Sequence, residues 1–241
     1  MHNLSLVLFI AKKKNQYYNL HKAIYYLTLA ADKNHLEAQF ILGSIYYNKD
    51  SRFYDLHKAV YYLTLAANKD HTNAQIYLIL IYLIDKFQYY DIDKAFYYLK
   101  IIANKNFPFA QYILGFFHAN KECKYYNINK SIHYLTLAAN QNYPDALFGL
   151  GCIYLIREFQ CYDINKAIHF LTLAANQNHS GAQFNLGIIY YKYHHVPRDI
   201  LKSIYYLTRA SNQNNSDAQF FLGVIYDSGK YVPQNINKAL H

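Results

Sequence analysis

The sequence predicts an all-α protein, a right-handed α-solenoid of helix–turn–helix repeats with a period of 36 residues. The first of three observations is a lysine that recurs at this constant interval, followed each time by Ala or Ser and then an apolar residue. These lysines are Lys22, Lys58, Lys94, Lys130, Lys166, Lys202 and Lys238. A helix-capping residue before each lysine and two apolar stripes with helical spacing after it are the other two observations. A fixed interval between about 20 and 50 residues is the signature of stacked repeats.

The first helix of each repeat, helix A, is predicted to begin at its capping residue. Three positions before each lysine stands Asn or Asp, whose side chain accepts hydrogen bonds from the free N–H groups of a first helical turn. These residues are Asn19, Asp55, Asp91, Asn127, Asp163, Asp199 and Asn235. The fifth repeat then places four apolar residues on one helical face, namely Ala167, Phe170, Leu171 and Ala174. We expect helices A over about Leu20–Ala31 and every 36 residues onward.

Helix A is predicted to stop at an Asn or Asp twelve positions after the lysine, because these residues tolerate the left-handed conformation that ends a helix. They are Asn34, Asp70, Asn106, Asn142, Asn178 and Asn214. Helix B follows, over about Leu36–Tyr47 and its equivalents, with a stripe of Ala, Leu and Tyr at intervals of four. The four prolines occupy only two repeat positions, both outside helix interiors: Pro108, Pro144, Pro197 and Pro233.

A glycine follows the Leu of helix B in five of six repeats. These are Gly43, Gly115, Gly151, Gly187 and Gly223. Because Gly inside a helix costs roughly 1 kcal/mol relative to Ala, we expect close helix packing to offset it. The second repeat has Ile79 at this position, which predicts a looser or shifted crossing of helices A and B there.

The domain organisation follows from the same pattern. We interpret residues 1–17 as a partial terminal helix of a truncated repeat with a linker, and residues 18–241 as the repeat array. Repeat units start near residues 19, 55, 91, 127, 163 and 199, with a partial unit from 235. Because solenoids need polar caps at their ends and neither end has one, we expect the chain to be a piece of a longer array.

Composition and charge favour no catalytic or nucleic-acid function. The formal charge is +9, but the excess is spread evenly, whereas a nucleic-acid footprint is a clustered basic stripe. Three cysteines form no CxxC pair, which suits free thiols in a reducing compartment. No signal peptide is recognisable, and the longest apolar runs, such as Ile76–Ile84, are shorter than a membrane span. We therefore expect a cytoplasmic protein.

These residues resemble the Sel-one-like repeat (SLR) family, a relative of the tetratricopeptide repeat. The family pattern is roughly G-x-x-V-x-x-D-x-x-K-A-x-x-W/Y-hydrophobic-x-x-A-A-x-x-G-x-x-x-A-Q-x-x-L-G-x-x-Y. Its opening is matched by Gly229, Val232, Asn235, Lys238 and Ala239. The remainder is matched by Lys22, Ala23, Tyr26, Leu27, Ala30, Ala31, Ala38, Gln39, Leu42, Gly43 and Tyr46. The resemblance implies an α-solenoid that serves as a non-catalytic scaffold or adaptor for other proteins, without a cofactor.

A second stripe on helix A provides the candidate binding site. Positions three and seven after each lysine lie roughly opposite the core face at about 100° per residue. They hold Tyr25, Leu29, Tyr61, Leu65, Tyr97, Ile101, His133, Leu137, His169, Leu173 and Tyr205, with Arg209 last. If helix A lines the concave surface, as the family implies, this stripe marks a site for a partner protein or peptide. The alternative is that superhelical curvature buries these residues between adjacent helices A.

No set of residues predicts a catalytic or metal centre. His35, His71 and His179 recur one repeat apart, too far to share one ion between helices about 8–10 Å apart, and His194-His195 has no adjacent ligand set. Cys152 falls at an apolar position of helix B. One alternative function is RNA binding by a helical repeat protein. Another is that the chain is the repeat region of a longer protein with a catalytic domain, for example a kinase, outside it.

Overall fold

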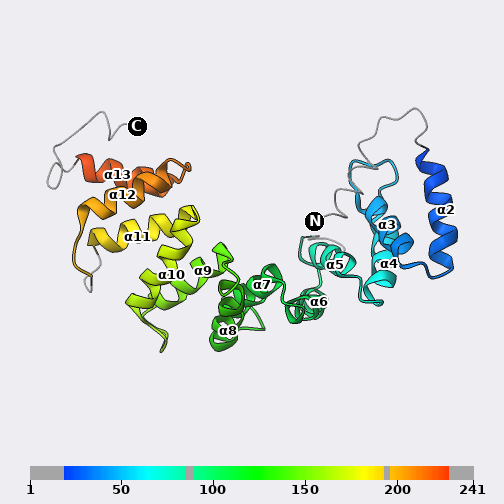
Figure 1. Ribbon diagram of the computed structural model, residues 1–241, viewed down its shortest axis with the longest axis horizontal. Helices are drawn as coiled ribbons and strands as arrows, with labels where there is room; N and C mark the ends of the chain where they lie inside the picture. The colour runs from blue at the N-terminus through cyan, green and yellow to red at the C-terminus, as the bar shows by residue number, and fades with distance from the viewer. Residues whose placement is uncertain (1–18, 85–88, 193–195, 228–241) are drawn as a thin grey trace. The chain divides into compact units, whose positions relative to one another are not determined.

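The computed structural model describes residues 19–84, 89–192 and 196–227. Over these ranges the chain is all-α, with twelve helices and no strand (Figure 1). Contacts divide the chain into two compact units, Met1–Lys105 and Asn106–His241. The partial terminal helix predicted within residues 1–17, the partial unit from 235 and Pro233 lie outside the described residues.

The helices alternate as the sequence predicts. Helices A are α2 (Leu20–Asp32), α4 (Leu56–Ala67) and α6 (Ile92–Asn104) in the first unit, and α8 (Ile128–Ala139), α10 (Ile164–Asn176) and α12 (Ile200–Ser211) in the second. Helices B are α3 (Leu36–Tyr47), α5 (Thr72–Ile84), α7 (Pro108–Ala119), α9 (Pro144–Leu155), α11 (Ser180–Lys192) and α13 (Ser216–Asp227). The period of 36 residues and the all-α repeat fold are confirmed.

The local signals of the sequence determine where the helices begin and end. In all six helices A the predicted Asn or Asp caps the first turn, as when Asp55 Oδ1 accepts from the Lys58 N–H at 3.0 Å. All six predicted turn residues adopt left-handed backbone angles, with φ between 57° and 65°. Pro108 and Pro144 occupy the first turns of α7 and α9, where a missing N–H is harmless.

The core of each unit lies where helix B meets the helices A on either side. Leu42, Leu114 and Leu186 are fully buried at 0% exposure, as their place in the helix B stripe predicts. Gly43 in α3 faces Leu63 in α4, and a Cβ on this glycine would lie 2.6 Å from the Leu63 Cγ. The same 2.6 Å contact recurs at three equivalent glycines of the second unit, Gly115, Gly151 and Gly187. Glycine therefore permits this close approach of helix B to the next repeat.

Ile79 on α5 loosens the packing against the following helix A, α6. It does not loosen the packing of α4 and α5 within its own repeat, where the sequence had predicted the change. The pair α5 and α6 is less closely packed than α3 and α4, and less than the three equivalent pairs of the second unit. Within the second repeat, α4 and α5 pack about as closely as α2 and α3, and as the pairs α8–α9, α10–α11 and α12–α13 of the second unit. The reason is geometric, because this position of helix B faces the following helix A.

Candidate functional site

The predicted stripe is accessible to solvent in the first unit. We call its six residues the first-unit row: Tyr25, Leu29, Tyr61, Leu65, Tyr97 and Ile101. The three tyrosines are 59%, 59% and 61% exposed, while Leu65 and Ile101 are half-buried. Neighbouring helices A therefore leave the rings uncovered, and the aliphatic residues between them remain partly accessible.

The second unit carries a row of different chemistry. The second-unit row consists of His133, Leu137, His169, Leu173, Tyr205 and Arg209. Its three aromatic residues are exposed, Leu173 is 37% exposed, and Leu137 and Arg209 are half-buried. Burial by curvature, the alternative left open by the sequence, is thus absent within either unit among the described residues.

Each exposed ring of the rows is held in place by a second ring. Tyr61 meets Tyr62 edge-on, with centroids 5.0 Å apart. Tyr62 in turn stacks on Tyr46 of the preceding helix B, with centroids 6.0 Å apart and planes inclined by 10°. All six repeats have the edge-on contact, and all but the first have the stacked one. The rings are therefore oriented before any partner arrives, which lowers the entropy lost on binding.

The recurrent lysine belongs to this aromatic arrangement. Lys58 Nζ lies 5.3 Å from the centre of the Tyr46 ring and 3.4 Å from Asp55 Oδ2. Lys94, Lys166 and Lys202 make the same two contacts. Burial raises the pKa of Tyr82, so the ring beneath Lys94 carries a neutral hydroxyl. The lysine thus links the cap of helix A to the ring that supports the row.

Neighbouring repeats are also joined by hydrogen bonds between a buried Gln and a Lys or Gln of the next repeat, which were not predicted from the sequence. Gln39 is fully buried and donates to the Ala31 carbonyl at 3.2 Å. Its Oε1 accepts from Lys69 Nζ of the next repeat at 3.1 Å. Equivalent bonds join Lys105 to Gln75, Gln141 to Gln111 and Gln213 to Gln183. The recurrence of a buried Gln with a Lys or Gln 30 residues later was the available signal.

The recurrent turn histidines act as helix caps. The Nδ1 atoms of His35, His71 and His179 accept from backbone N–H groups at 3.1–3.3 Å. His71 Nε2 also lies 3.6 Å from Glu37 Oε1 of the preceding repeat. No group of three His, Cys, Asp or Glu in the described part of the chain could hold a metal, and His194-His195 lies outside that part.

Cys152 is unsuited to nucleophilic chemistry in this environment. Burial raises the pKa of its thiol to about 11, although the Asn185 amide, 3.5 Å from Sγ, acts in the opposite direction. A reactive cysteine instead needs a lowered pKa and a neighbouring base.

None of the described helices is long and apolar enough to span a membrane.

The stacked helix pairs, left-handed Asn or Asp turns and glycine crossings define the class of protein, an α-helical repeat array. The Sel1 repeat family model matches residues 13–35, 36–71, 81–107, 108–143, 144–179, 180–215 and 216–241. The chain therefore belongs to the Sel1 repeat family, as the sequence analysis predicted. Arrays of these repeats are generally scaffolds for protein interactions and are typically non-catalytic.

Two solved structures illustrate the likeness. A Sel1 repeat protein from Oxalobacter formigenes is 27% identical, with a TM-score of 0.78 over 97% of this chain and 68% of that one. A protective antigen of uropathogenic Escherichia coli with an SLR fold is 24% identical, with a TM-score of 0.57. That match covers 90% of this chain and 54% of the antigen, and it supports the fold alone. Among curated proteins, no relative matched the chain.

Proposed function

We propose that this chain is a non-catalytic scaffold or adaptor that binds a partner protein or peptide on the exposed faces of its helices A. We propose, as the family resemblance implies, that these faces line the concave surface. The observation that supports the proposal is the repetition of an exposed, oriented aromatic ring above an apolar residue on successive helices. Tyrosines of this kind are common binding hot spots. A cytoplasmic location remains part of the proposal, and cell fractionation tests it.

The partner is expected to present apolar side chains at intervals that match successive helices A. Each of the first five repeats offers the partner a polar tip, the Tyr hydroxyl or His nitrogen, beside an aliphatic residue, and the sixth has Arg209 in place of the aliphatic residue. Such amphipathic surfaces favour an extended segment or one face of a helix. Because the first unit has three such sites and the second has two, several modest contacts in series provide the affinity.

Site-specific photocrosslinking tests the proposal directly. A benzoylphenylalanine replaces Tyr61 or Tyr205 in the rows, and in a matched control it replaces Phe116, which is 54% exposed on helix B. After irradiation in native cell extract, we expect the same partner protein at both row positions and none at the control position. Crosslinks that are equal at all three positions would contradict the proposal.

Substitution then measures how much the row contributes. Tyr61→Ser together with Tyr97→Ser should weaken capture of the crosslinked partner by about tenfold or more, since hot-spot tyrosines contribute about 2 kcal/mol or more. Ile84→Ser, an exposed apolar control in the same unit, should leave it unchanged. If RNA is recovered instead, and binding falls steeply with salt, the RNA-binding alternative takes its place.

A further inference from the structure

One cation of the second-unit row has no acidic partner in the described part of the chain. Arg209 on α12 is half-buried and makes three hydrogen bonds, all to neutral groups. It donates to the Tyr205 hydroxyl at 3.3 Å, the Ala175 carbonyl at 3.1 Å and Asn178 Oδ1 at 2.9 Å. A guanidinium has five N–H donors, so two remain for another ligand.

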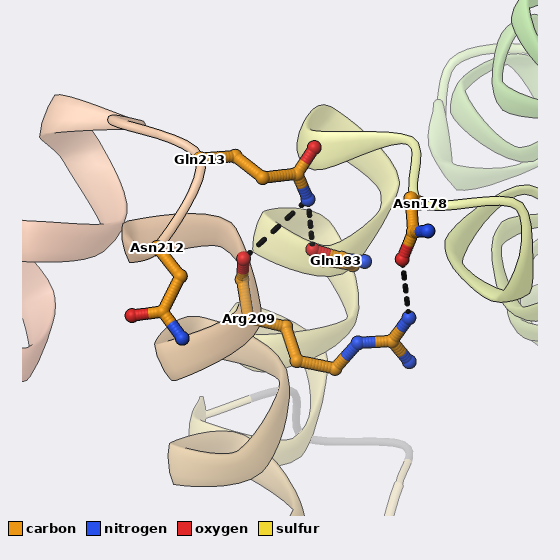
Figure 2. A pocket seen from close by; sticks show the side chains of 5 residues that line it. All are labelled: Asn178, Gln183, Arg209, Asn212 and Gln213. Carbon is orange, nitrogen blue, oxygen red and sulfur yellow. Dashed lines mark hydrogen bonds between the residues drawn. The ribbon is translucent and has the colours of Figure 1, made fainter.

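This guanidinium faces a small polar depression on the second unit. The depression has a volume of about 360 Å³ and is lined by Asn178, Gln183, Arg209, Asn212 and Gln213. Figure 2 shows Arg209 and Asn212 coming from the end of α12, with the guanidinium directed at Asn178 across the depression. The side chain of Asn212 makes no hydrogen bond to another described residue, and it lines the same depression.

The equivalent turn in the first unit is neutralised internally. There Lys105 Nζ lies 2.6 Å from Asp70 Oδ1, and this bond lowers the pKa of the Asp70 carboxyl. In the second unit the residue at the Asp70 position is the neutral Asn178. Lys69 also donates only to neutral acceptors. It differs from Arg209 because it is exposed to water and its three N–H donors are already used. Arg209 combines partial burial, spare donors and a depression.

We propose that the depression at Arg209 receives a carboxylate side chain of the partner peptide. Neighbouring apolar residues of the same peptide contact Leu173 and Tyr205. This inference rests on the proposed function and deepens it. Arginine pairs with carboxylates through short, charge-assisted hydrogen bonds. Arg209 is the only arginine or lysine of the second-unit row, so this one contact fixes the register of the partner. The partner is therefore an Asp- or Glu-containing segment with aliphatic or aromatic neighbours.

A peptide selection provides the test. Random 12-residue peptides on phage are selected against the full chain, and against the Arg209→Gln and Lys130→Gln variants. Lys130 is exposed on α8 in the same unit and its side chain makes no hydrogen bond, ion pair or ring contact with another described residue, so it controls for net charge. We expect Asp or Glu to be enriched with the wild type and with Lys130→Gln, and not with Arg209→Gln. Circular dichroism and a thermal melt establish that each variant is folded.

A double-mutant cycle on the best synthetic peptide makes the result quantitative. Replacing the peptide Glu by Gln should weaken binding to the wild type about tenfold, and binding to Arg209→Gln less than twofold. The difference in affinity of the wild type for the Glu and Gln peptides should shrink at high salt. If Arg209→Gln does not fold, Asn178→Asp decides. It places a carboxylate on the Arg209 guanidinium, as Asp70 does for Lys105 in the first unit. It should reduce the Glu-to-Gln difference, and an unchanged difference would overturn the proposal.

The remaining outcomes separate this inference from the proposed function. Selected peptides without acidic residues, or a cycle without coupling, would overturn the carboxylate site and leave the proposed function intact. Failure to select any peptide on the wild type would overturn both. A phosphoserine peptide that binds more than tenfold tighter than its Glu counterpart would replace the carboxylate by a phosphate.

Discussion

Two junctions of the first unit solve the same packing problem with different residues. Between α3 and α4, Gly43 lets the helices approach until only a hydrogen fits against Leu63. Between α5 and α6, Ile79 fills the equivalent position and is 1% exposed, and the helices stand less closely together. Leu63 and Leu99, the equivalent leucines of helices A, are both fully buried. The core can therefore close at two helix spacings, provided that side-chain volume and spacing change together.

The comparison shows what the repeat tolerates and what it keeps. The aromatic stack and lysine contact are present at both junctions, through Tyr46 and Lys58 at one and Tyr82 and Lys94 at the other. An Asp carboxylate that accepts from the lysine N–H caps the following helix A at both, and at Asp91 the N–H of Asp93 adds a second bond. The spacing of the helices thus varies while the elements that support the exposed row are retained.

The largest effect should come from emptying the wider junction. Ile79→Gly removes a buried side chain without bringing α6 closer, and it places a glycine inside α5. We expect a loss of about 3–6 kcal/mol in unfolding free energy, from a cavity of the Ile→Ala kind plus the helix cost of glycine. Urea denaturation followed by circular dichroism measures it. A near-neutral effect would mean that α5 and α6 can close to the glycine spacing.

Truncation of a core leucine to Ala should destabilise the protein by a similar amount at both junctions. Leu42→Ala and Leu78→Ala each remove a side chain of 0% exposure, and we expect about 2–5 kcal/mol for each. Leu65→Ala, on the exposed row of the same unit, should have a much smaller effect. Thermal melts of the three variants make the comparison. If Leu65→Ala is as destabilising as Leu42→Ala, the row belongs to the core.

The reverse exchange tests the close junction. Gly43→Ile forces a branched side chain against Leu63, whose backbone nitrogen would lie 3.2 Å from the new Cβ. We expect a loss of about 1–3 kcal/mol, typical of overpacking, even though isoleucine favours the helix more than glycine does. Combining it with Leu63→Ala should recover part of the loss. Independent, additive effects of the two changes would exclude direct contact as the cause.

The sequence predicted the helices well because their ends are determined locally. A cap such as Asp55 and a turn residue such as Asn34 act on the few backbone groups beside them, so one sequence suffices to locate them. The exposure of Tyr61 followed from its place opposite the core face. Its edge-on support by Tyr62 did not, because that depends on side-chain rotamers.

Contacts between repeats were harder to predict. The recurrent lysine was the strongest signal, yet its partner Tyr46 lies on another helix and became evident only in three dimensions. The direction in which Ile79 acts also depends on which helix A it faces. A sequence signal existed at one further junction: His118 on helix B of the third repeat stands where other repeats have Tyr, and the next cap is Asn127 where four repeats have Asp. There Lys130 has neither the ion pair nor the ring contact among the described residues.

The smallest expected effect is a loss of stability at acidic pH, and the caps at the two junctions should contribute equally to it. The backbone N–H of Lys58 lowers the pKa of Asp55 below its ordinary value of 3.8. Burial opposes this effect, and the Lys58 ammonium group lowers the pKa further. Lys94 acts in the same way on the pKa of Asp91, where the backbone N–H of Asp93 adds to the lowering. Since the folded pKa is lowered, this stabilisation is complete above about pH 4 and is lost as the pH falls through the folded value.

Each cap should contribute less than about 1 kcal/mol, because these carboxylates are largely solvated. Asp55→Asn and Asp91→Asn keep the cap and remove its titration, so each should flatten the decline in the urea midpoint between pH 5 and pH 3 by the same amount. Asn127→Asp, in the second unit, should steepen it. An Asp91→Asn effect that differed from that of Asp55→Asn would show that the wider spacing at Ile79 reaches the start of α6.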